Sequence, residues 1–214
     1  HMRAKALRGQ PSVEAELGRV RRYVRGIVTQ WSLVSVMAVL CVAESVGLTE
    51  LGLRLPTSLP GAVGAAIFVG AALTLLIVQA RYIAGSAEVQ ALLREQVGGL
   101  DVVAPRSAVE FRVFLLVSVT AGICEELLYR GFLVWYLDAL IGWWPALLVS
   151  TLLFGLAHAY QGVVGVAKTT VVGLILAGLL AVSGTLVFSM VLHVLIDALN
   201  GVSMYMAMRE RLER

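Results

Sequence analysis

Long apolar stretches with almost no charge dominate this sequence and restrict what it can fold into. Six of them are long enough to cross about 30 Å of hydrocarbon as helices at about 1.5 Å per residue. They cover residues 27–48, 61–84, 113–137, 144–160, 164–182 and 185–208. Of the 214 residues, 59% are hydrophobic and only 14% are charged, whereas an ordinary soluble domain carries about 25% charged residues. We therefore expect an all-α polytopic transmembrane bundle of about six spans, embedded in a lipid bilayer, and exclude a soluble enzyme or a disordered chain.

Lysine and arginine residues gather on one side of these predicted spans. Seven of the 17 precede residue 27 and, if the amino terminus is cytoplasmic, only Arg54 and Arg130 fall outside the cytoplasmic side. Such a bias favours a cytoplasmic location of both termini. We expect a multi-pass protein of a bacterial-type inner or cell membrane. The net charge of +3 then reflects membrane orientation, so no nucleic-acid partner is expected.

Four regions follow from this pattern. Residues 1–26 hold a His-Met start typical of a cloning scar and a basic cytoplasmic arm, whose apolar residues recur at the spacing of an amphipathic helix on an anionic membrane surface. A solvated arm is the alternative. Residues 27–106 hold two spans and a cytoplasmic linker, residues 107–205 a helical core, and residues 206–214 a basic cytoplasmic tail. Ser107 and Glu110 have the spacing of a capping box that would start the third span.

Ionisable residues inside apolar spans are costly and usually mark a function. They occur in four places here: Glu44, then Glu125 with Glu126 and Arg130, then His158, and finally His193 with Asp197. Glu44 lies near the end of its span, and we expect it simply to reach the interface. The other three places need a common explanation.

The third span carries a carboxylate that its arginine does not reach. On a helix, Glu126 and Arg130 are four residues apart and share a face, whereas Glu125 lies about 140° away from Arg130. The arginine is expected to neutralise Glu126, which leaves Glu125 for general acid or base chemistry. The alternative is an ion pair with a second glutamate at a water-filled edge.

The last span presents a polar stripe. His193 and Asp197 are four residues apart, and Ser189 and Asn200 continue the same face. His158 stands alone on an apolar helix, where a hydrogen-bonded core histidine is the ordinary interpretation. By depth along their helices Glu125 and His193 fall at nearly the same level, while His158 requires a tilted or broken fourth helix to join them. We expect one site where these helices converge.

Three short motifs make the expectation specific. They are EELLYRG at 125–131, FGLAH at 154–158 and HVLID at 193–197. In this order, on successive apolar segments, they resemble the motifs of the CAAX prenyl protease and bacteriocin-processing family, also called the Abi or Rce1-like family of intramembrane glutamate proteases. The resemblance covers roughly residues 107–205, which would then be the catalytic core.

The resemblance implies an endopeptidase that cleaves a membrane-associated or lipidated peptide without an obligatory cofactor. Glu125 and His158 would activate a water, and His193 and Asp197 would stabilise the oxyanion. An ionised Asp197 cannot donate a hydrogen bond, so we expect it to orient and charge His193, which donates instead. The supporting residues would be Glu126, Arg130, Phe154 and Asn200.

Several alternatives stay open at this stage. A divalent metal such as zinc has Glu125, His158, His193 and Asp197 as candidate ligands, although no His-Glu-x-x-His pair is present. A cysteine mechanism through Cys124 is disfavoured, because an apolar site suppresses the thiolate. A proton-coupled transporter would more often show two similar halves. A non-catalytic membrane scaffold or bacteriocin-immunity protein of the same fold is the main alternative to an enzyme.

Overall fold

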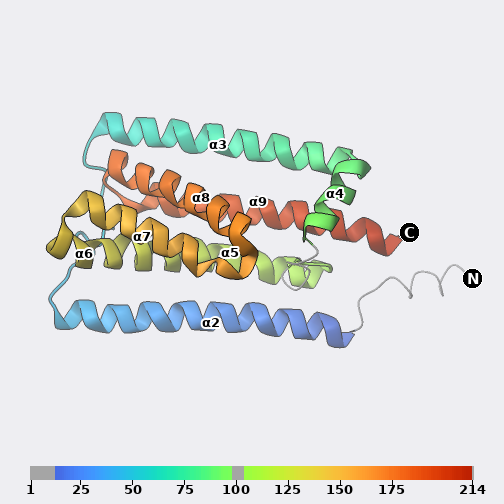
Figure 1. Ribbon diagram of the computed structural model, residues 1–214, viewed down its shortest axis with the longest axis horizontal. Helices are drawn as coiled ribbons and strands as arrows, with labels where there is room; N and C mark the ends of the chain where they lie inside the picture. The colour runs from blue at the N-terminus through green and yellow to red at the C-terminus, as the bar shows by residue number, and fades with distance from the viewer. Residues whose placement is uncertain (1–12, 98–103, 214) are drawn as a thin grey trace, which may run out of the picture. The chain divides into compact units, whose positions relative to one another are not determined.

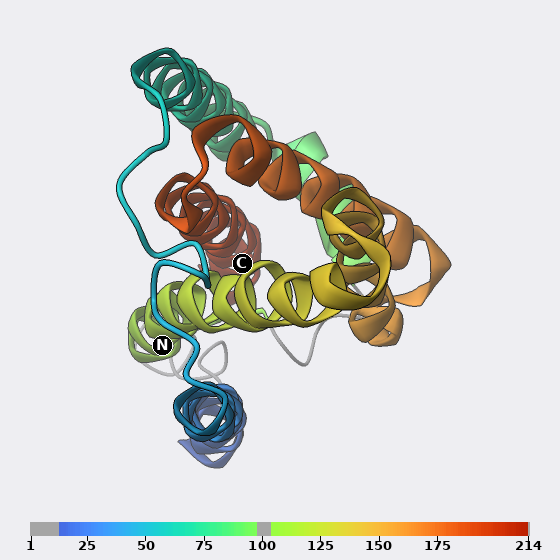
Figure 2. The same ribbon diagram turned by 90° about the vertical axis from the view of Figure 1, so that its left-hand side faces the viewer.

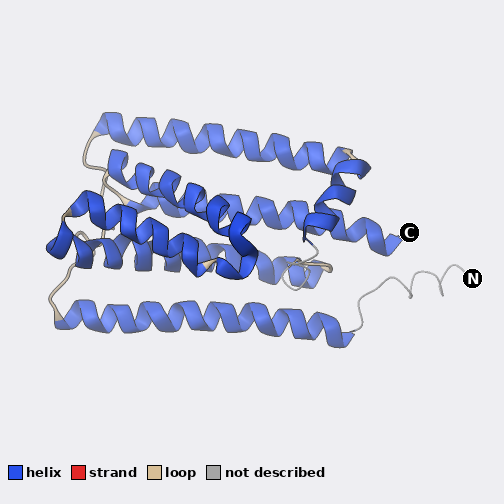
Figure 3. Ribbon diagram, viewed as in Figure 1, coloured by secondary structure: helices blue, strands red, loops and turns tan. Residues whose placement is uncertain are grey.

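Helices account for nearly all of the structure. The computed structural model describes residues 13–97 and 104–213, and over these residues it contains helices and connections but no strand (Figure 3). In chain order (Figure 1) the elements are α2 (Val13–Ala43), α3 (Leu59–Gly85), α4 (Ala87–Val97), α5 (Ala108–Glu125), the π-helix η1 (Glu126–Leu133), α6 (Val134–Ile141), α7 (Trp143–Ala157), the 3₁₀ turn η2 (Ala159–Gln161), α8 (Gly162–Ser183) and α9 (Leu186–Glu213). The all-α prediction is confirmed. The scar, the first part of the basic arm and Arg214 lie outside the described residues.

Four long helical stretches have the length and apolar composition to cross a membrane. They are Val13–Ala43, Leu59–Gly85, Ala159–Ser183 and Leu186–Met208. Helix α2 begins at Val13, so the arm continues into the first predicted span without a break. The predicted span 113–137 falls on α5, η1 and α6 in succession. The predicted span 144–160 corresponds to α7, whose 15 residues reach only about 22 Å. The chain is thus an integral membrane protein, but two of its six predicted spans are built from shorter segments.

The chain divides into two compact units. Unit 1 comprises His1–Val28, Leu73–Val119 and Leu195–Arg214, and unit 2 comprises Thr29–Ala72 and Thr120–Val194.

Unit 1 contains a capped and ion-paired start of α5. The Ser107 hydroxyl accepts the backbone N–H of Glu110 at 3.1 Å, and the Glu110 carboxylate accepts the backbone N–H of Arg106 at 2.7 Å. The predicted capping box is therefore confirmed, with the return bond going to Arg106. The same carboxylate accepts a bond from Nε of Arg19 at 2.8 Å, and both side chains are buried. Arg19 consequently does not lie on a solvated arginine face, because a buried carboxylate requires a cation nearby.

Unit 2 holds an apolar core to which α2, η1, α6, α7, α8 and α9 contribute. Its buried members are Met37, Cys41, Leu51, Leu127, Val134, Ala146, Leu147, Ala177, Leu180 and Leu186. Gly142 and Gly184 have φ values of 84° and 72° at the ends of α6 and α8, where glycine accommodates a sharp reversal without a Cβ clash. The chain therefore reverses tightly enough to pack these helices side by side.

The connection between α2 and α3 is hydrogen-bonded to the turn between α8 and α9. Leu186 donates its backbone N–H to Gly52, and Thr57 donates its own to Ser183, at 2.9 and 3.0 Å. Figure 2 shows this connection crossing the ends of the unit 2 helices from α2 to α3. The connection between the first two helices is thus joined to the turn between α8 and α9 by main-chain hydrogen bonds.

Close backbone contact sets the distance between α5 and α9 in unit 2. A Cβ placed on Gly122 would lie 2.4 Å from Cγ2 and 2.9 Å from the backbone nitrogen of Val194. Only a glycine allows this approach. The contact lies one helical turn before Glu125 and directly after His193, so it brings two predicted site residues together.

Candidate active site

The two adjacent glutamates lie at a change of helix type. Helix α5 ends at Glu125, and the π-helix η1 begins at Glu126. A π-helix is rare, often occurs at functional sites and has more residues per turn than an α-helix, so neighbouring side chains diverge by a smaller angle. Glu125 and Glu126 can therefore point toward the same partner, which is difficult for neighbours on an α-helix.

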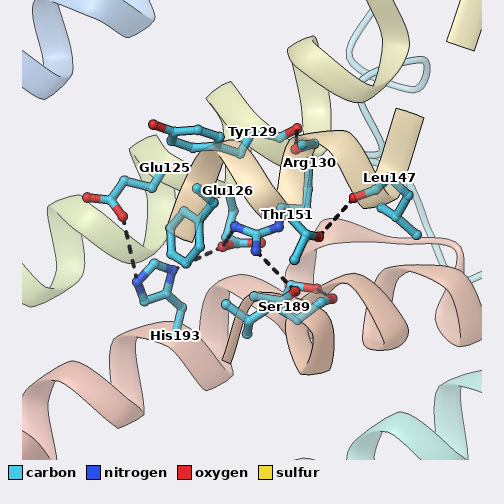
Figure 4. A network of polar contacts seen from close by, with 12 residues as sticks. Glu125, Glu126, Tyr129, Arg130, Leu147, Thr151, Ser189 and His193 are labelled. Carbon is cyan, nitrogen blue, oxygen red and sulfur yellow. Dashed lines mark hydrogen bonds and ion pairs between the residues drawn. The ribbon is translucent and has the colours of Figure 1, made fainter. Parts of the chain in front are cut away.

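That shared partner is His193 on α9. Its Nδ1 lies 3.0 Å from Oε1 of Glu126, and its Nε2 lies 3.9 Å from Oε2 of Glu125. Figure 4 shows the imidazole between the two carboxylates. His193 is 4% exposed and Glu126 is fully buried. A single imidazole thus faces two carboxylates, one in hydrogen-bond contact and one slightly further away.

Arg130 completes this cluster from the same π-helix. Its Nη1 donates to Oε1 of Glu126 at 3.0 Å, and its Nη2 donates to the carbonyl of Gly173 at 3.1 Å. The predicted pairing of Glu126 with Arg130 is therefore observed. One carboxylate oxygen of Glu126 serves both Arg130 and His193, so this residue links the cation to the imidazole.

Phe154 on α7 joins the cluster to His158. The guanidinium carbon of Arg130 lies 4.2 Å from the centre of the Phe154 ring, a cation–π contact. The same ring packs edge-on against His193 and obliquely against His158, with centroid distances of 5.7 and 4.9 Å. Phe154 is 1% exposed. It therefore acts as an apolar spacer that contacts both histidine rings.

His158 ends α7, as the expectation of a broken fourth helix requires. Its backbone leaves helical geometry at φ −95° and ψ 18°, and η2 follows. Its Nδ1 lies 2.8 Å from the carbonyl oxygen of Phe154. A carbonyl accepts only, so Nδ1 carries the hydrogen there and Nε2 of a neutral ring keeps its lone pair. His158 thus has the tautomer that a proton acceptor needs.

One residue beside Glu125 was not predicted. Nε2 of Gln30, on α2, donates to Oε1 of Glu125 at 2.7 Å. The sequence contained a signal for it, because Gln30 is the only amide side chain in the predicted span 27–48. The contact joins residues 95 positions apart, which no local spacing rule identifies.

The remaining predicted residues are Ser189, Glu44, Asp197 and Asn200. Ser189 donates to the carbonyl of Leu176 at 2.8 Å, an interhelical bond. Glu44 follows the end of α2 and is exposed. Asp197 is half-buried and Asn200 is exposed, both on the part of α9 that belongs to unit 1. Glu126 makes a hydrogen-bond contact with Nδ1 of His193, and the role of Asp197 in orienting and charging His193 stays a prediction.

Metal ligands and thiols are the other reactive groups that the sequence raised. In the described part of the chain, no group of three or more histidine, cysteine, aspartate or glutamate side chains is arranged to hold a metal ion. Cys41 and Cys124 are free thiols, and both are buried.

Comparison with known proteins identifies the segment that carries the site. Residues 107–199 match the family model of type II CAAX prenyl endopeptidase Rce1-like proteins. We call this matched segment the Rce1-like domain. It contains Glu125, Arg130, His158 and His193, so the predicted family resemblance is confirmed. Searches of curated proteins and of solved structures found no match. Gln30 and the rest of α2 and α3 lie outside the Rce1-like domain.

Proposed function

We propose that this protein is an intramembrane endopeptidase that hydrolyses a peptide bond of a membrane-associated or lipidated peptide. One observation carries the proposal: within the Rce1-like domain, Glu125 and Glu126 face the two ring nitrogens of His193. Two carboxylates and one imidazole in a membrane protein supply a base, an acid and a hydrogen-bond donor in surroundings that hold little bulk water.

The proposed reaction begins with proton removal from a water. Glu125 takes the proton while His158 accepts a hydrogen bond from the same water through Nε2, and the water oxygen attacks the peptide carbonyl carbon. The carbonyl oxygen becomes an oxyanion, which a protonated His193 stabilises with its N–H. The C–N bond then breaks as Glu125 passes its proton to the leaving amine nitrogen. Water and peptide are consumed, and a carboxylic acid and an amine are formed.

Supporting residues hold this arrangement in place. Glu126 accepts hydrogen bonds from Arg130 and from Nδ1–H of His193, which fixes the direction of the ring. Asp197, four residues further along α9, is proposed to add to the negative charge around His193. Phe154 keeps the two imidazoles at a fixed separation.

The test uses the purified protein in liposomes with a fluorogenic peptide in two versions, one with S-farnesylcysteine near its carboxyl terminus and one with free cysteine. Substitution Glu125→Gln removes the base with little change in shape. We expect cleavage of at least one version by the unaltered protein and a loss of about 10²- to 10⁴-fold in the variant, the usual contribution of a general base. Mass spectrometry of the products identifies the bond.

Glu44→Gln is the matched control, because Glu44 is also a glutamate in the apolar region but lies exposed after α2. It should cleave at the unaltered rate. Equal turnover by Glu125→Gln would reject Glu125 as the base. Failure of the unaltered protein to cleave either peptide, with binding retained, would favour the non-catalytic scaffold.

A further inference from the structure

Helix α2 meets its own unit through a single narrow stripe. In unit 2 its residues that are not exposed are Gln30, Val34, Met37 and Cys41. Their spacing of four, three and four residues is the heptad spacing of one helix packing along another. Only 11% of the apolar window of α2 is buried within the protein. Each position on the stripe therefore matters for where α2 lies.

Gln30 is the polar member of this otherwise apolar stripe. An aliphatic side chain of similar size would pack there at least as well, because a buried amide must find partners for both its donor and its acceptor. Nε2 finds Glu125, but Oε1 of Gln30 is buried with no hydrogen-bond partner among the described residues. An amide at this position costs stability, which indicates that its contact with Glu125 serves another purpose.

Gln30 and His193 approach different oxygens of the Glu125 carboxylate. Gln30 donates to Oε1 of Glu125, and His193 lies 3.9 Å from Oε2. The two oxygens therefore face different partners on opposite sides, and rotation of the carboxylate about its last bond is opposed. An N–H donor also stabilises the ionised form of a carboxylate over the protonated form, and only the ionised form can act as a base.

We infer that Gln30 is a positioning residue for Glu125, contributed by a helix outside the Rce1-like domain. This inference rests on the proposed function. The amide fixes the direction of the carboxylate and keeps it ionised, while α2 delivers the amide through its heptad stripe. The first helix is then a part of the active site as well as a membrane anchor.

Substitution Gln30→Leu tests this role, because it preserves size and removes the hydrogen bond. We expect kcat to fall by about 10- to 100-fold, the range that a small misplacement of a reacting group produces, with KM changed by less than about twofold. The midpoint of thermal unfolding should stay the same or rise. Ser32→Leu is the matched control, since Ser32 is an exposed polar residue two positions along the same helix, and its kcat should equal that of the unaltered protein.

A second measurement does not depend on turnover. Dicyclohexylcarbodiimide modifies protonated carboxyl groups in apolar surroundings, and peptide mass spectrometry reports the modified residue. Gln30→Leu should increase modification of Glu125 severalfold and leave that of Glu126 unchanged, because Glu126 keeps Arg130 and His193. Ser32→Leu should alter neither.

The outcomes separate the two proposals. Unchanged kcat and unchanged modification of Glu125 in Gln30→Leu would overturn the role of Gln30 and leave the endopeptidase proposal intact. The role would also be overturned if the unfolding midpoint fell far enough for loss of folded protein to explain the loss of kcat, since Gln30 would then be structural. If the unaltered protein cleaves nothing, the endopeptidase proposal fails, and the modification of Glu125 still decides whether Gln30 controls its protonation.

Discussion

At the scale of single residues, we expect stability to be sensitive to substitution of the buried ion pair between Glu126 and Arg130. Glu126 and Arg130 are both buried and joined at 3.0 Å, and a buried pair is far more costly to break than to replace as a whole. We predict that Arg130→Met lowers the free energy of unfolding by about 3–5 kcal/mol, the cost of an uncompensated buried charge. A denaturant titration in mixed micelles measures it.

The double variant Glu126→Gln with Arg130→Met is the control for this prediction. It removes both charges, so most of the lost stability should return. Equal losses in the single and the double variant would mean that packing, and not charge, holds this part of η1.

The sequence predicted the pairing of Glu126 with Arg130 but not the contact of Gln30 with Glu125, and the difference has a physical reason. Glu126 and Arg130 lie four apart on one helix, so their pairing follows from helical geometry. The contact of Gln30 with Glu125 depends on how α2 is rotated about its axis. Lipid-facing and bundle-facing sides of a membrane helix are both apolar, so the pattern that reveals the buried face of a soluble helix is weak here.

At the scale of elements, α8 contains a site where packing depends on the absence of one methyl group. A Cβ on Gly173 would lie 2.8 Å from Nη2 of Arg130 and 3.1 Å from the ring of Phe154, whereas nothing lies within 4 Å of Gly178 on the same helix. We predict that Gly173→Ala destabilises the protein by about 1–3 kcal/mol through overpacking. Gly178→Ala should be neutral or stabilising by about 0.5–1 kcal/mol.

The two variants are compared by thermal unfolding in the same detergent, and Gly173→Ala should also reduce peptide cleavage because it displaces Arg130. If both substitutions shifted the unfolding midpoint alike, the close approach at Gly173 would be refuted.

The helices themselves were largely predictable, but their boundaries were less so. Apolar length identified the membrane segments because hydrocarbon thickness sets that length. It placed the third predicted span within a helical run that the structure divides into α5, η1 and α6, since nothing in hydropathy distinguishes a π-helix from an α-helix. Depth predicted a tilted or broken fourth helix at His158 without deciding between the two, because Tyr160, Gln161 and Gly162 give only a short polar break in a long apolar run.

At the scale of the whole molecule, the bias of lysine and arginine makes a prediction about orientation. The connection around Thr49 is expected on the outer side and the region around Glu88 in the cytoplasm; both residues are exposed. In intact cells, a membrane-impermeant maleimide should label Thr49→Cys and should label Glu88→Cys only after the membrane is opened.

The two native cysteines provide the background for this experiment. Cys41 and Cys124 are 5% and 0% exposed, so the unaltered protein should remain unlabelled until it is denatured. Labelling of Glu88→Cys in closed cells, with Thr49→Cys protected, would reverse the proposed orientation.

The π-helix η1 has a consequence for changes in chain length. Its wider turn accommodates one more residue than an α-helix would within the same rise, and Glu126 and Arg130 lie inside it. Removing a single leucine from this stretch would let the backbone tighten, and Arg130 would then swing away from its carboxylate although no charged side chain had been touched. The number of residues between Glu126 and Leu133 is therefore constrained as strictly as the identity of the charged side chains. This holds even where the intervening residues are ordinary aliphatic ones.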